Sequence, residues 1–182
     1  MTMEIEIVNV VVSASIGTEL DLQKISAALE ELEYDPERFP GAIYRVKEPK
    51  TALLFFRSGK IVCTGAKSLK DVENVISEMV KRLESIGVKI SKHPEITVQN
   101  IVATTDLGAE LKLNAIAISL GLEKVEYEPE QFPGLVYRVE DPKVVALLFG
   151  SGKVVCTGAK KVKDIERAVE NIRIELESAG FI

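Results

Sequence analysis

The sequence predicts an α+β fold made of two copies of one structural unit. Three observations lead to this prediction: a long internal repeat, short apolar segments separated by turn sequences, and segments with helical periodicity. Residues 34–67 align without a gap with residues 127–160, and 22 of the 34 aligned positions are identical. We therefore expect a first repeat, residues 1–90, and a second repeat, residues 91–182, in a pseudo-twofold arrangement.

The repeat extends upstream, where Val8–Gly17 matches Gln99–Gly108 and pairs Asn9 with Asn100. The offset between the repeats is 91 residues in this part and 93 residues in the longer match. Two extra residues near Gly121 account for the shift.

The first repeat opens with a strand and a helix. The apolar, β-branched segment Ile5–Val12 predicts the strand. Leucine and isoleucine recur at helical spacing over Thr18–Leu32 and predict a helix, with Thr18 or Asp21 as its N-cap. Proline and glycine then mark a loop. Turn sequences divide the following residues into three short strands, Ala42–Val46, Thr51–Phe56 and Lys60–Thr64.

An amphipathic helix closes each repeat. In the first repeat, apolar side chains recur at helical spacing from Val72 to Leu83, and Gly87 provides a C-cap. The corresponding helix of the second repeat is predicted near Val162–Ser178, before Gly180.

The strands Thr51–Phe56 and Lys60–Thr64 are apolar at consecutive positions, so both faces of the sheet are apolar there. The hairpin turns indicate an antiparallel sheet, and two helices per repeat can cover only one of its faces. The other face is predicted to be an exposed apolar patch of the kind that forms an interface. The alternative is that this face packs against a second copy of the chain or a loop.

The net charge of −5 does not favour a nucleic-acid partner, but the charge is unevenly distributed. Residues 34–67 carry seven Lys or Arg and three Asp or Glu, whereas residues 18–33 carry five acidic residues and Lys24. Because DNA contacts one face of a protein, the local positive charge leaves DNA binding open.

Strand alternation places Val62 and Thr64 on one face of the sheet and Cys63 on the other, and Val155 and Thr157 are equivalent in the second repeat. Small apolar and hydroxyl side chains suit the minor groove of DNA, which is read largely by its shape.

Asn9 and Asn100 lie among apolar strand residues, where a buried amide needs a partner. An asparagine amide can donate to adenine N3 and thymine O2, the acceptors that an A·T pair offers in the minor groove. The alternative is a residue at a strand end or bulge that bonds to the backbone.

Phe39 recurs as Phe132, and Phe56 recurs as Phe149. An aromatic side chain in a strand is usually a core residue, but Phe39 and Phe132 fall in loops, where burial is harder. Such residues could act as wedges between base steps. Cations recur in register around them, as phosphate contacts would: Arg45 and Arg138, Lys60 and Lys153, Lys67 and Lys160.

Catalytic, metal and cofactor sites are not expected. His93 is the only histidine, and the two cysteines, Cys63 and Cys156, belong to different repeats, so no metal-ligand cluster or disulfide framework is indicated. Glu128 and Glu130 could form an acid/base pair, but they alternate along a solvated loop. No apolar run is long enough to cross a membrane, and the first residues do not resemble a signal peptide.

The strings FPG-x-x-YR and SGK-x-V-x-TGAK, each present twice, resemble the core of the TATA-box-binding protein family over about residues 5–180. The resemblance implies a pseudo-twofold saddle: a curved antiparallel sheet of about ten strands, with four helices on its convex face and DNA on its concave face. That family is itself a standard example of a minor-groove binder with apolar wedges and a large kink, so the mechanism comes with the resemblance.

The resemblance also implies roles for single residues. Phe39 with Phe56, and Phe132 with Phe149, would be two intercalating pairs. Asn9 and Asn100 would lie near the centre of the site, beside Thr64 and Thr157. The apolar floor would be formed by Val11, Leu54, Val62, Val102, Leu147 and Val155. Phosphates would be contacted by Arg38, Arg45, Lys60, Lys67, Arg138, Lys153 and Lys160.

The partners that the resemblance implies are double-stranded promoter DNA with a TATA box, a B-type general transcription factor that meets Glu128 and Glu130, and, indirectly, RNA polymerase. The function implied is a general transcription initiation factor. Gln131 replaces the arginine found at Arg38, and the chain is acidic overall, which resembles archaeal rather than nuclear members. We expect a cytoplasmic protein at the nucleoid if it is archaeal and a nuclear one if eukaryotic. Two other hypotheses stand beside a promoter-recognition factor. The protein could be an interaction module whose apolar face forms a homodimer in the absence of DNA, or an enzyme of the base-repair type on a related fold.

Overall fold

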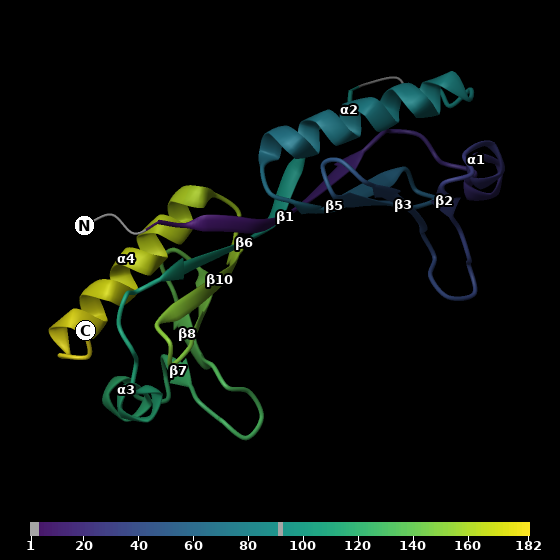
Figure 1. The fold of residues 1–182 in the computed structure, drawn as a ribbon. Coiled ribbons are helices and arrows are strands. Elements are labelled where there is room, and N and C mark those ends of the chain that lie inside the picture. Colours follow the sequence, from purple (N-terminus) through teal and green to yellow (C-terminus); the bar gives the residue numbers. More distant parts are fainter. Residues whose placement is uncertain (1–3, 91–92) are drawn as a thin grey trace. The chain divides into compact units, whose positions relative to one another are not determined.

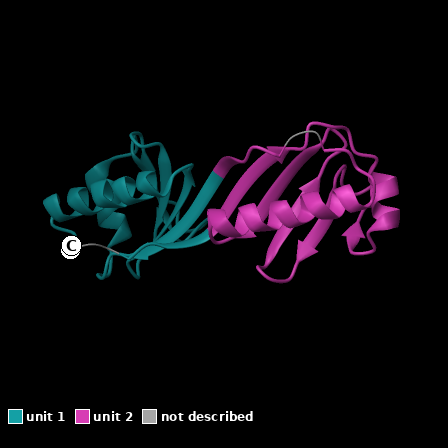
Figure 2. Cartoon of the chain, turned by 90° about the horizontal axis from the view of Figure 1, so that it is seen from above, with its two compact units in different colours: residues 1–8, 100–182 teal, residues 9–99 magenta. Residues whose placement is uncertain are grey.

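The computed structural model describes residues 4–90 and 93–182, and the chain forms two compact units. The first-repeat unit is residues 9–99, magenta in Figure 2. The second-repeat unit joins residues 100–182 to the residues before Asn9 and is teal in Figure 2. The boundary falls between Val8 and Asn9, inside the first strand, β1 (Glu6–Ser15).

The first-repeat unit contains two helices and four strands besides its part of β1. In chain order these are α1 (Leu22–Ala28), β2 (Leu32–Glu33), β3 (Ala42–Val46), β4 (Thr51–Phe55), β5 (Lys60–Ala66) and α2 (Leu69–Ser85).

The second-repeat unit has the same element order. It contains β6 (Thr97–Asp106), which begins in the other unit, and then α3 (Leu113–Leu120), β7 (Val125–Glu126), β8 (Leu135–Val139), β9 (Val144–Leu148), β10 (Lys153–Ala159) and α4 (Val162–Ser178).

The strands make a ten-stranded sheet in the order β2-β3-β4-β5-β1-β6-β10-β9-β8-β7. Neighbouring strands within each unit are antiparallel, as the hairpin turns predicted. The predicted α+β class, with ten strands and, within the described residues, four helices, is confirmed.

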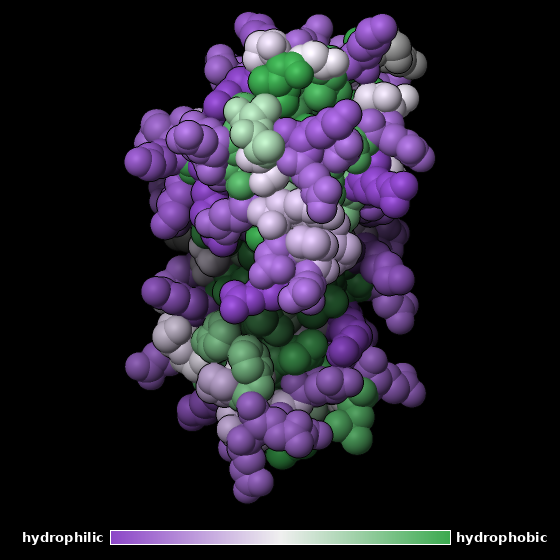
Figure 3. Space-filling view, turned by 90° about the vertical axis from the view of Figure 1, so that its right-hand side faces the viewer, coloured by the Kyte–Doolittle hydropathy of each residue, from purple (hydrophilic) through white to green (hydrophobic). Residues whose placement is uncertain are grey.

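One face of each unit's strands is covered by a long helix, α2 or α4 (Figure 1). Side chains on the covered face, such as Leu53, Phe55 and Ile61, are almost fully buried, and so is the apolar side of α2 from Val72 to Leu83. Hydrophilic residues make up most of the surface in Figure 3, with hydrophobic residues visible between them. Within residues 4–90 and 93–182, no helix is both long and apolar enough to cross a membrane.

The helix predicted over Thr18–Leu32 is shorter in the structure. Asp21 is the N-cap, because its side chain accepts a hydrogen bond from the Lys24 N–H at 3.3 Å, and α1 ends at Ala28. Leu29 and Leu32 are both buried, but Leu32 belongs to β2 and pairs with Tyr44 on β3. The leucine spacing therefore reflects burial that continues beyond the helix.

Other boundaries move by a few residues. The first strand extends to Ser15 and β5 to Ala66, because each continues its pairing with the other. Phe56 lies just outside β4, which ends at Phe55. Helix α4 spans Val162–Ser178, as predicted.

Cys63 and Cys156 are free thiols on the covered face and are buried at equivalent positions of β5 and β10. Burial raises the pKa of each thiol to about 11, because the interior disfavours the thiolate. Both are therefore core side chains without the chemistry of reactive thiols.

Candidate nucleic-acid interface

The strand face that no helix covers, which we call the open face, has the same construction in both units. Its central row in the first-repeat unit runs across the strands through Ile43, Leu54, Val62 and Ser13. These side chains are half-buried, whereas their neighbours along each strand are mostly buried against the helices. The equivalent row in the second-repeat unit is Val136, Leu147, Val155 and Thr104.

The six residues predicted to form an apolar floor all lie on the open face and are half-buried. A second row of the first-repeat unit passes through Arg45, Ala52 and Thr64. Its counterpart passes through Arg138, Val145 and Thr157. The open face thus combines aliphatic and hydroxyl side chains with an arginine near its outer edge.

The structure brings the predicted phenylalanine pairs together. Phe39, from the loop before β3, meets Phe56 edge to face, with ring centroids 5.8 Å apart and an interplanar angle of 61°. Phe132 and Phe149 meet in the same way, at 5.9 Å and 64°. Phe132 keeps 39% of its surface exposed, which is unusual for a large apolar side chain because such side chains are stabilised by burial.

A glycine makes room for each phenylalanine pair, a role that its residue type alone did not indicate. A Cβ atom at Gly41 would lie 2.8 Å from the Phe39 ring and 3.0 Å from the Phe55 carbonyl oxygen. At Gly134 it would lie 2.7 Å from the Phe132 ring and 3.1 Å from the Phe149 ring. The recurrence of FPG in both repeats is the signal that could have revealed this requirement.

The turn that follows each second phenylalanine is held against the rest of its unit. Gly59 has a positive φ of 91°, and its carbonyl oxygen accepts a hydrogen bond from the Ile16 N–H at 3.1 Å. A Cβ atom at Gly59 would lie 2.2 Å from the Thr18 carbonyl oxygen, so no larger residue fits. Gly152 is in the same situation against Ala109, at 2.3 Å.

Asn9 and Asn100 bond to the backbone across the sheet. The Asn9 side-chain oxygen accepts from the Gly65 N–H at 2.7 Å, and the Asn100 oxygen accepts from the Gly158 N–H at 2.6 Å. Each glycine lies where the strand register shifts, with φ near +92° and +97°. Both asparagines therefore bond to the backbone at a bulge through the side-chain oxygen, which leaves the role of the NH₂ group open.

This backbone bond also orients each amide. Because a backbone N–H can only donate, the amide oxygen must face the glycine and the NH₂ group must face away. The Asn9 NH₂ donates to the Thr64 hydroxyl at 3.5 Å, and the Asn100 NH₂ donates to the Thr157 hydroxyl at 3.0 Å. Each amide carries two N–H donors, so one of them is left over for a ligand on the open face.

The predicted phosphate-binding cations fall into two groups. Three arginines already have carboxylate neighbours: Arg38 with Asp35 at 3.6 Å, Arg45 with Glu33 at 3.9 Å, and Arg138 with Glu126 at 3.4 Å. All three pairs are more than half exposed, so water and salt weaken them. The four lysines, Lys60, Lys67, Lys153 and Lys160, are exposed.

Glu128 and Glu130 are exposed in the loop between β7 and β8. The Glu128 carbonyl oxygen accepts hydrogen bonds from the Gln131 and Phe132 N–H groups, both at 3.0 Å. The two carboxylates are thus presented on the same tight turn that positions Phe132.

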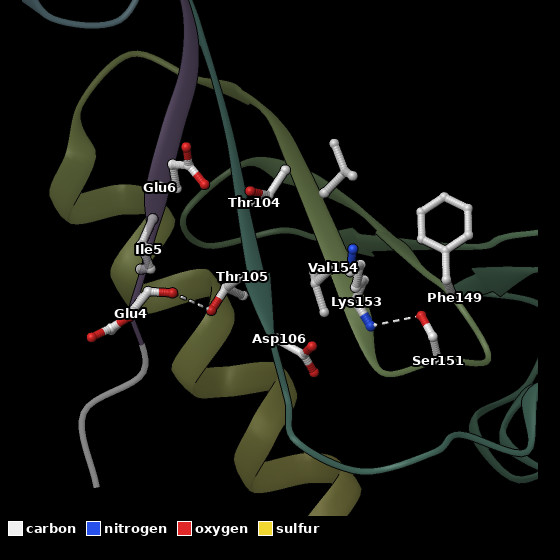
Figure 4. Close-up of a pocket in the computed structure, with 11 residues that line it drawn as sticks. Glu4, Ile5, Glu6, Thr104, Thr105, Asp106, Phe149, Ser151, Lys153 and Val154 are labelled. Atoms are coloured by element: carbon white, nitrogen blue, oxygen red, sulfur yellow. Dashed lines mark hydrogen bonds between the residues drawn. The ribbon is translucent and has the colours of Figure 1, made fainter.

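A hollow of about 1150 Å³ lies beside Phe149 and Lys153 (Figure 4). The Thr105 hydroxyl donates to the Glu4 carbonyl oxygen at 2.6 Å, which fastens the residues before β1 to β6. Glu6 and Asp106 also line the hollow, but among the described residues no group of three His, Cys, Asp or Glu could hold a metal ion.

The two repeats of this chain are each matched by one protein family. The family model described as transcription factor TFIID, or TATA-binding protein, matches residues 4–86 and again residues 95–179. A TATA-box-binding protein of Picrophilus torridus is 59% identical over 179 residues, which cover 98% of this chain and 97% of the relative. That of Archaeoglobus fulgidus is 55% identical, covering 98% of each chain.

The solved structure of Methanococcus jannaschii TBP superposes with a TM-score of 0.88 at 53% sequence identity. The match covers 96% of this chain and 99% of that one. With both repeats matched and identity above half over nearly its whole length, the chain belongs to the TATA-binding protein family.

Proposed function

We propose that the chain is a general transcription initiation factor that binds TATA-box promoter DNA in the minor groove and bends it. The observation that carries this proposal is the pair of edge-to-face phenylalanines, present at the same place in both units beside an apolar open face. Relatives named as TATA-box-binding proteins support it.

The phenylalanine pairs would act as wedges. Phe56 and Phe149 are half-buried and lie at the ends of their strands, next to turns that are fixed to the rest of each unit. Inserting such a pair unstacks a base step at a cost of a few kcal/mol, which the larger contact area of bent DNA offsets. A rigid turn keeps the wedge from folding back during insertion.

The centre of the site would be read by the asparagines. The free N–H of the Asn9 and Asn100 amides can donate to the adenine N3 and thymine O2 acceptors. At the same place, a guanine amino group would be a second donor opposite the asparagine N–H, and no hydrogen bond could form between the two. The arrangement therefore favours A·T pairs.

We further propose that residues 1–90 and 91–182 together form one continuous DNA-binding saddle. The equivalent rows of the two open faces and the double match to the family support this proposal. Phosphates would be held by the seven cations described above, with the exposed lysines as the main contributors.

The partners beyond DNA follow from the same family membership. Glu128 and Glu130 offer exposed carboxylates to a B-type general transcription factor, through which RNA polymerase would be recruited. The protein would act in the compartment that holds the DNA: the cytoplasm, at the nucleoid, for an archaeal-type member, or the nucleus in a eukaryote.

The test compares binding and bending on three duplexes of equal length: a TATA-like site, a scrambled A/T-rich sequence and a G/C-rich sequence. We expect a gel shift and a large drop in end-to-end distance by fluorescence energy transfer on the TATA-like duplex. Equal affinity for all three duplexes, without bending, would contradict the proposal.

The apolar open face favours a second candidate, self-association in the absence of DNA. Sedimentation equilibrium would then show dimers that dissociate when the TATA-like duplex is added. A chain that stays monomeric at high concentration would exclude this candidate.

A further inference from the structure

The lysine that ends the turn after each second phenylalanine lies opposite a different residue in the two repeats. Lys60, the first residue of β5, pairs with Ser15 of β1, and Lys153, the first residue of β10, pairs with Asp106 of β6. Directly opposite residues of an antiparallel pair project from the same face of the sheet, with their Cβ atoms about 5 Å apart. On the open face, the first-repeat lysine therefore has a hydroxyl as its neighbour, and the second-repeat lysine has a carboxylate.

The Asp106 carboxylate is fixed beside the second-repeat turn. Its Oδ1 atom accepts a hydrogen bond from the Gly108 N–H at 2.9 Å, and a Cβ atom at Gly152 would lie 3.2 Å from that oxygen. In the first repeat, the Ser15 hydroxyl accepts the equivalent bond from the Gly17 N–H at 3.2 Å. The backbone is thus held alike in both repeats, and the negative charge at Asp106 is what differs.

The hollows beside the two lysines differ in the same direction. The hollow of the first-repeat unit is lined by one carboxylate, two basic side chains and several hydroxyls, which belong to Glu95, Lys60, His93, Ser13, Ser15 and Thr97. The hollow beside Lys153 is lined by three carboxylates, those of Glu4, Glu6 and Asp106 (Figure 4). A phosphate is negatively charged, so the surroundings of Lys153 are the less favourable ones for it.

We propose that Asp106 is a specificity-determining residue that weakens the phosphate contact of Lys153, so that the two turns hold the DNA backbone with unequal strength. The inference rests on the proposed function. A phosphate that approaches Lys153 also approaches the Asp106 carboxylate, and this repulsion cancels part of the attraction of the lysine. Lys60 has no such opponent across the strand, because Ser15 is uncharged and its hydroxyl can donate a hydrogen bond to a phosphate.

The size of the effect follows from the exposure of these groups. Lys60, Lys153 and Asp106 are all exposed, so water and salt screen their interactions. An interaction between exposed charges changes an equilibrium by about twofold to fivefold. We therefore expect Lys60→Ala to weaken DNA binding by a larger factor than Lys153→Ala, with about a twofold to fivefold difference between the two factors.

Asp106 also accepts the Gly108 N–H, and two substitutions separate this structural role from the electrostatic one. Asp106→Asn removes the charge and keeps a side-chain oxygen that can accept the bond. Asp106→Ser introduces the residue type that accepts the equivalent bond at Ser15. Glu166→Gln, at an exposed position of α4, makes the same change in net charge on the covered side of the strands and is the matched control.

The experiment measures the affinity for the TATA-like duplex by fluorescence anisotropy over a series of potassium chloride concentrations. Each lysine is removed with and without the change at its cross-strand neighbour, which gives two double-mutant cycles. The first cycle combines Lys153→Ala with Asp106→Asn, and the second combines Lys60→Ala with Ser15→Asp. Thermal melts of every variant and bending by energy transfer accompany the titrations.

We expect Asp106→Asn and Asp106→Ser to tighten binding by about twofold to fivefold, whereas Glu166→Gln changes it little. The slope of log K against log salt should become more negative by up to about 0.9, the value of one additional phosphate contact. With Asp106→Asn present, Lys153→Ala should weaken binding more than it does in the parent chain and approach the effect of Lys60→Ala. Ser15→Asp should reduce the effect of Lys60→Ala in the same way.

The results separate this inference from the function on which it rests. If every protein bends the duplex but Lys153→Ala weakens binding equally with and without Asp106→Asn, the inference about Asp106 is wrong and the proposed function stands. A lower melting temperature in the Asp106 variants, without tighter binding, would likewise assign Asp106 a structural role only. If none of the proteins, the parent chain included, bends the duplex, the proposed function fails and the inference fails with it.

Discussion

Arg82 and Glu175 occupy equivalent positions in the two long helices, 93 residues apart, yet they carry opposite charges. On α2, Arg82 donates a hydrogen bond to the Tyr44 hydroxyl and lies over the Tyr44 ring, 5.4 Å from its centroid. On α4, Glu175 accepts a hydrogen bond from the Tyr137 hydroxyl. The tyrosine hydroxyl at this equivalent position therefore accepts a hydrogen bond in the first repeat and donates one in the second.

The reversal includes a second pair of residues. Arg82 pairs with Glu31 at 3.3 Å, and Glu175 pairs with Lys124 at 3.1 Å. Glu31 and Lys124 are also 93 residues apart, so the whole ion pair is inverted between the repeats. Such an inversion keeps the local attraction while removing the charge symmetry of the two helical surfaces.

The inverted pair predicts a charge-swap result. Arg82→Glu should lower the melting temperature by a few degrees, because it places a second carboxylate beside that of Glu31. Adding Glu31→Lys should restore most of the loss by recreating the arrangement of the second repeat. Lys81→Glu, an exposed neighbour on α2, is the control for net charge. Thermal melts in which the double variant is no better than the single one would contradict the pairing.

Two adjacent phenylalanines provide a matched test of the wedges. Phe56 lies on the open face, whereas Phe55 is 1% exposed and belongs to the core. Phe56→Ala should fold normally but bind and bend the TATA-like duplex less. Phe55→Ala should lose about 3–5 kcal/mol of stability. Circular dichroism and energy transfer on both variants distinguish the roles, and a Phe56→Ala chain that unfolds while survivors bend DNA normally would refute the wedge.

The asparagines predict a response to the guanine amino group. An I·C pair lacks this group but keeps the major-groove pattern of G·C, so the parent chain should accept I·C at the central positions much better than G·C. Asn9→Ala with Asn100→Ala should narrow that gap by about 1–3 kcal/mol, the usual value of one base-pair mismatch. A gap of equal size in both proteins would mean that the ease of bending the duplex, and not the amides, sets the preference.

Salt dependence reports how many cations meet phosphates. Each neutralised phosphate contributes about −0.9 to the slope of log K against log salt, so seven contacts would give about −6. Because three arginines already have carboxylate neighbours, we expect a slope of about −3 to −6. Lys60→Ala should flatten it by about one unit. Lys70→Ala, at an exposed position of α2, is the control and should leave the slope unchanged. A binding constant that does not change with the potassium chloride concentration would contradict the assigned phosphate contacts.

Because both thiols are buried, we expect them not to react with thiol reagents while the chain is folded. With their pKa raised to about 11, Cys63 and Cys156 should react with a disulfide reagent at pH 8 only after unfolding. Their contribution to stability is complete below the unfolded pKa of about 8.5 and is lost as the pH rises through about 11. Glu73→Cys should react at once in the folded chain. Rapid labelling of the native thiols would show that the covered face opens readily.

The sequence predicted the elements of the fold well where local signals agreed with tertiary packing. The turn predicted between Thr51–Phe56 and Lys60–Thr64 and the alternation of Val62, Cys63 and Thr64 are both found in the structure. The end of α1 could not be predicted, because Leu32 is buried through pairing with Tyr44, a residue distant in sequence.

The candidate site was predictable as a set of residues but not as a geometry. The recurrence of Asn9 and Asn100 was visible in the sequence, yet the direction of each amide depends on a bulge that brings the Gly65 or Gly158 N–H to the side-chain oxygen. Likewise, the sequence shows FPG twice, but only the packing shows that Gly41 must lack a side chain for the Phe39 ring to fit.

The division of β1 between the two units bears on how the chain is made. The residues just before Asn9 belong to the unit that is otherwise formed by residues 100–182, and the Glu4 carbonyl oxygen is bonded by Thr105. On the ribosome, this segment is synthesised about a hundred residues before its partner strand, β6, is translated. The second-repeat unit therefore folds around a segment that was synthesised before the whole of the first-repeat unit, residues 9–99.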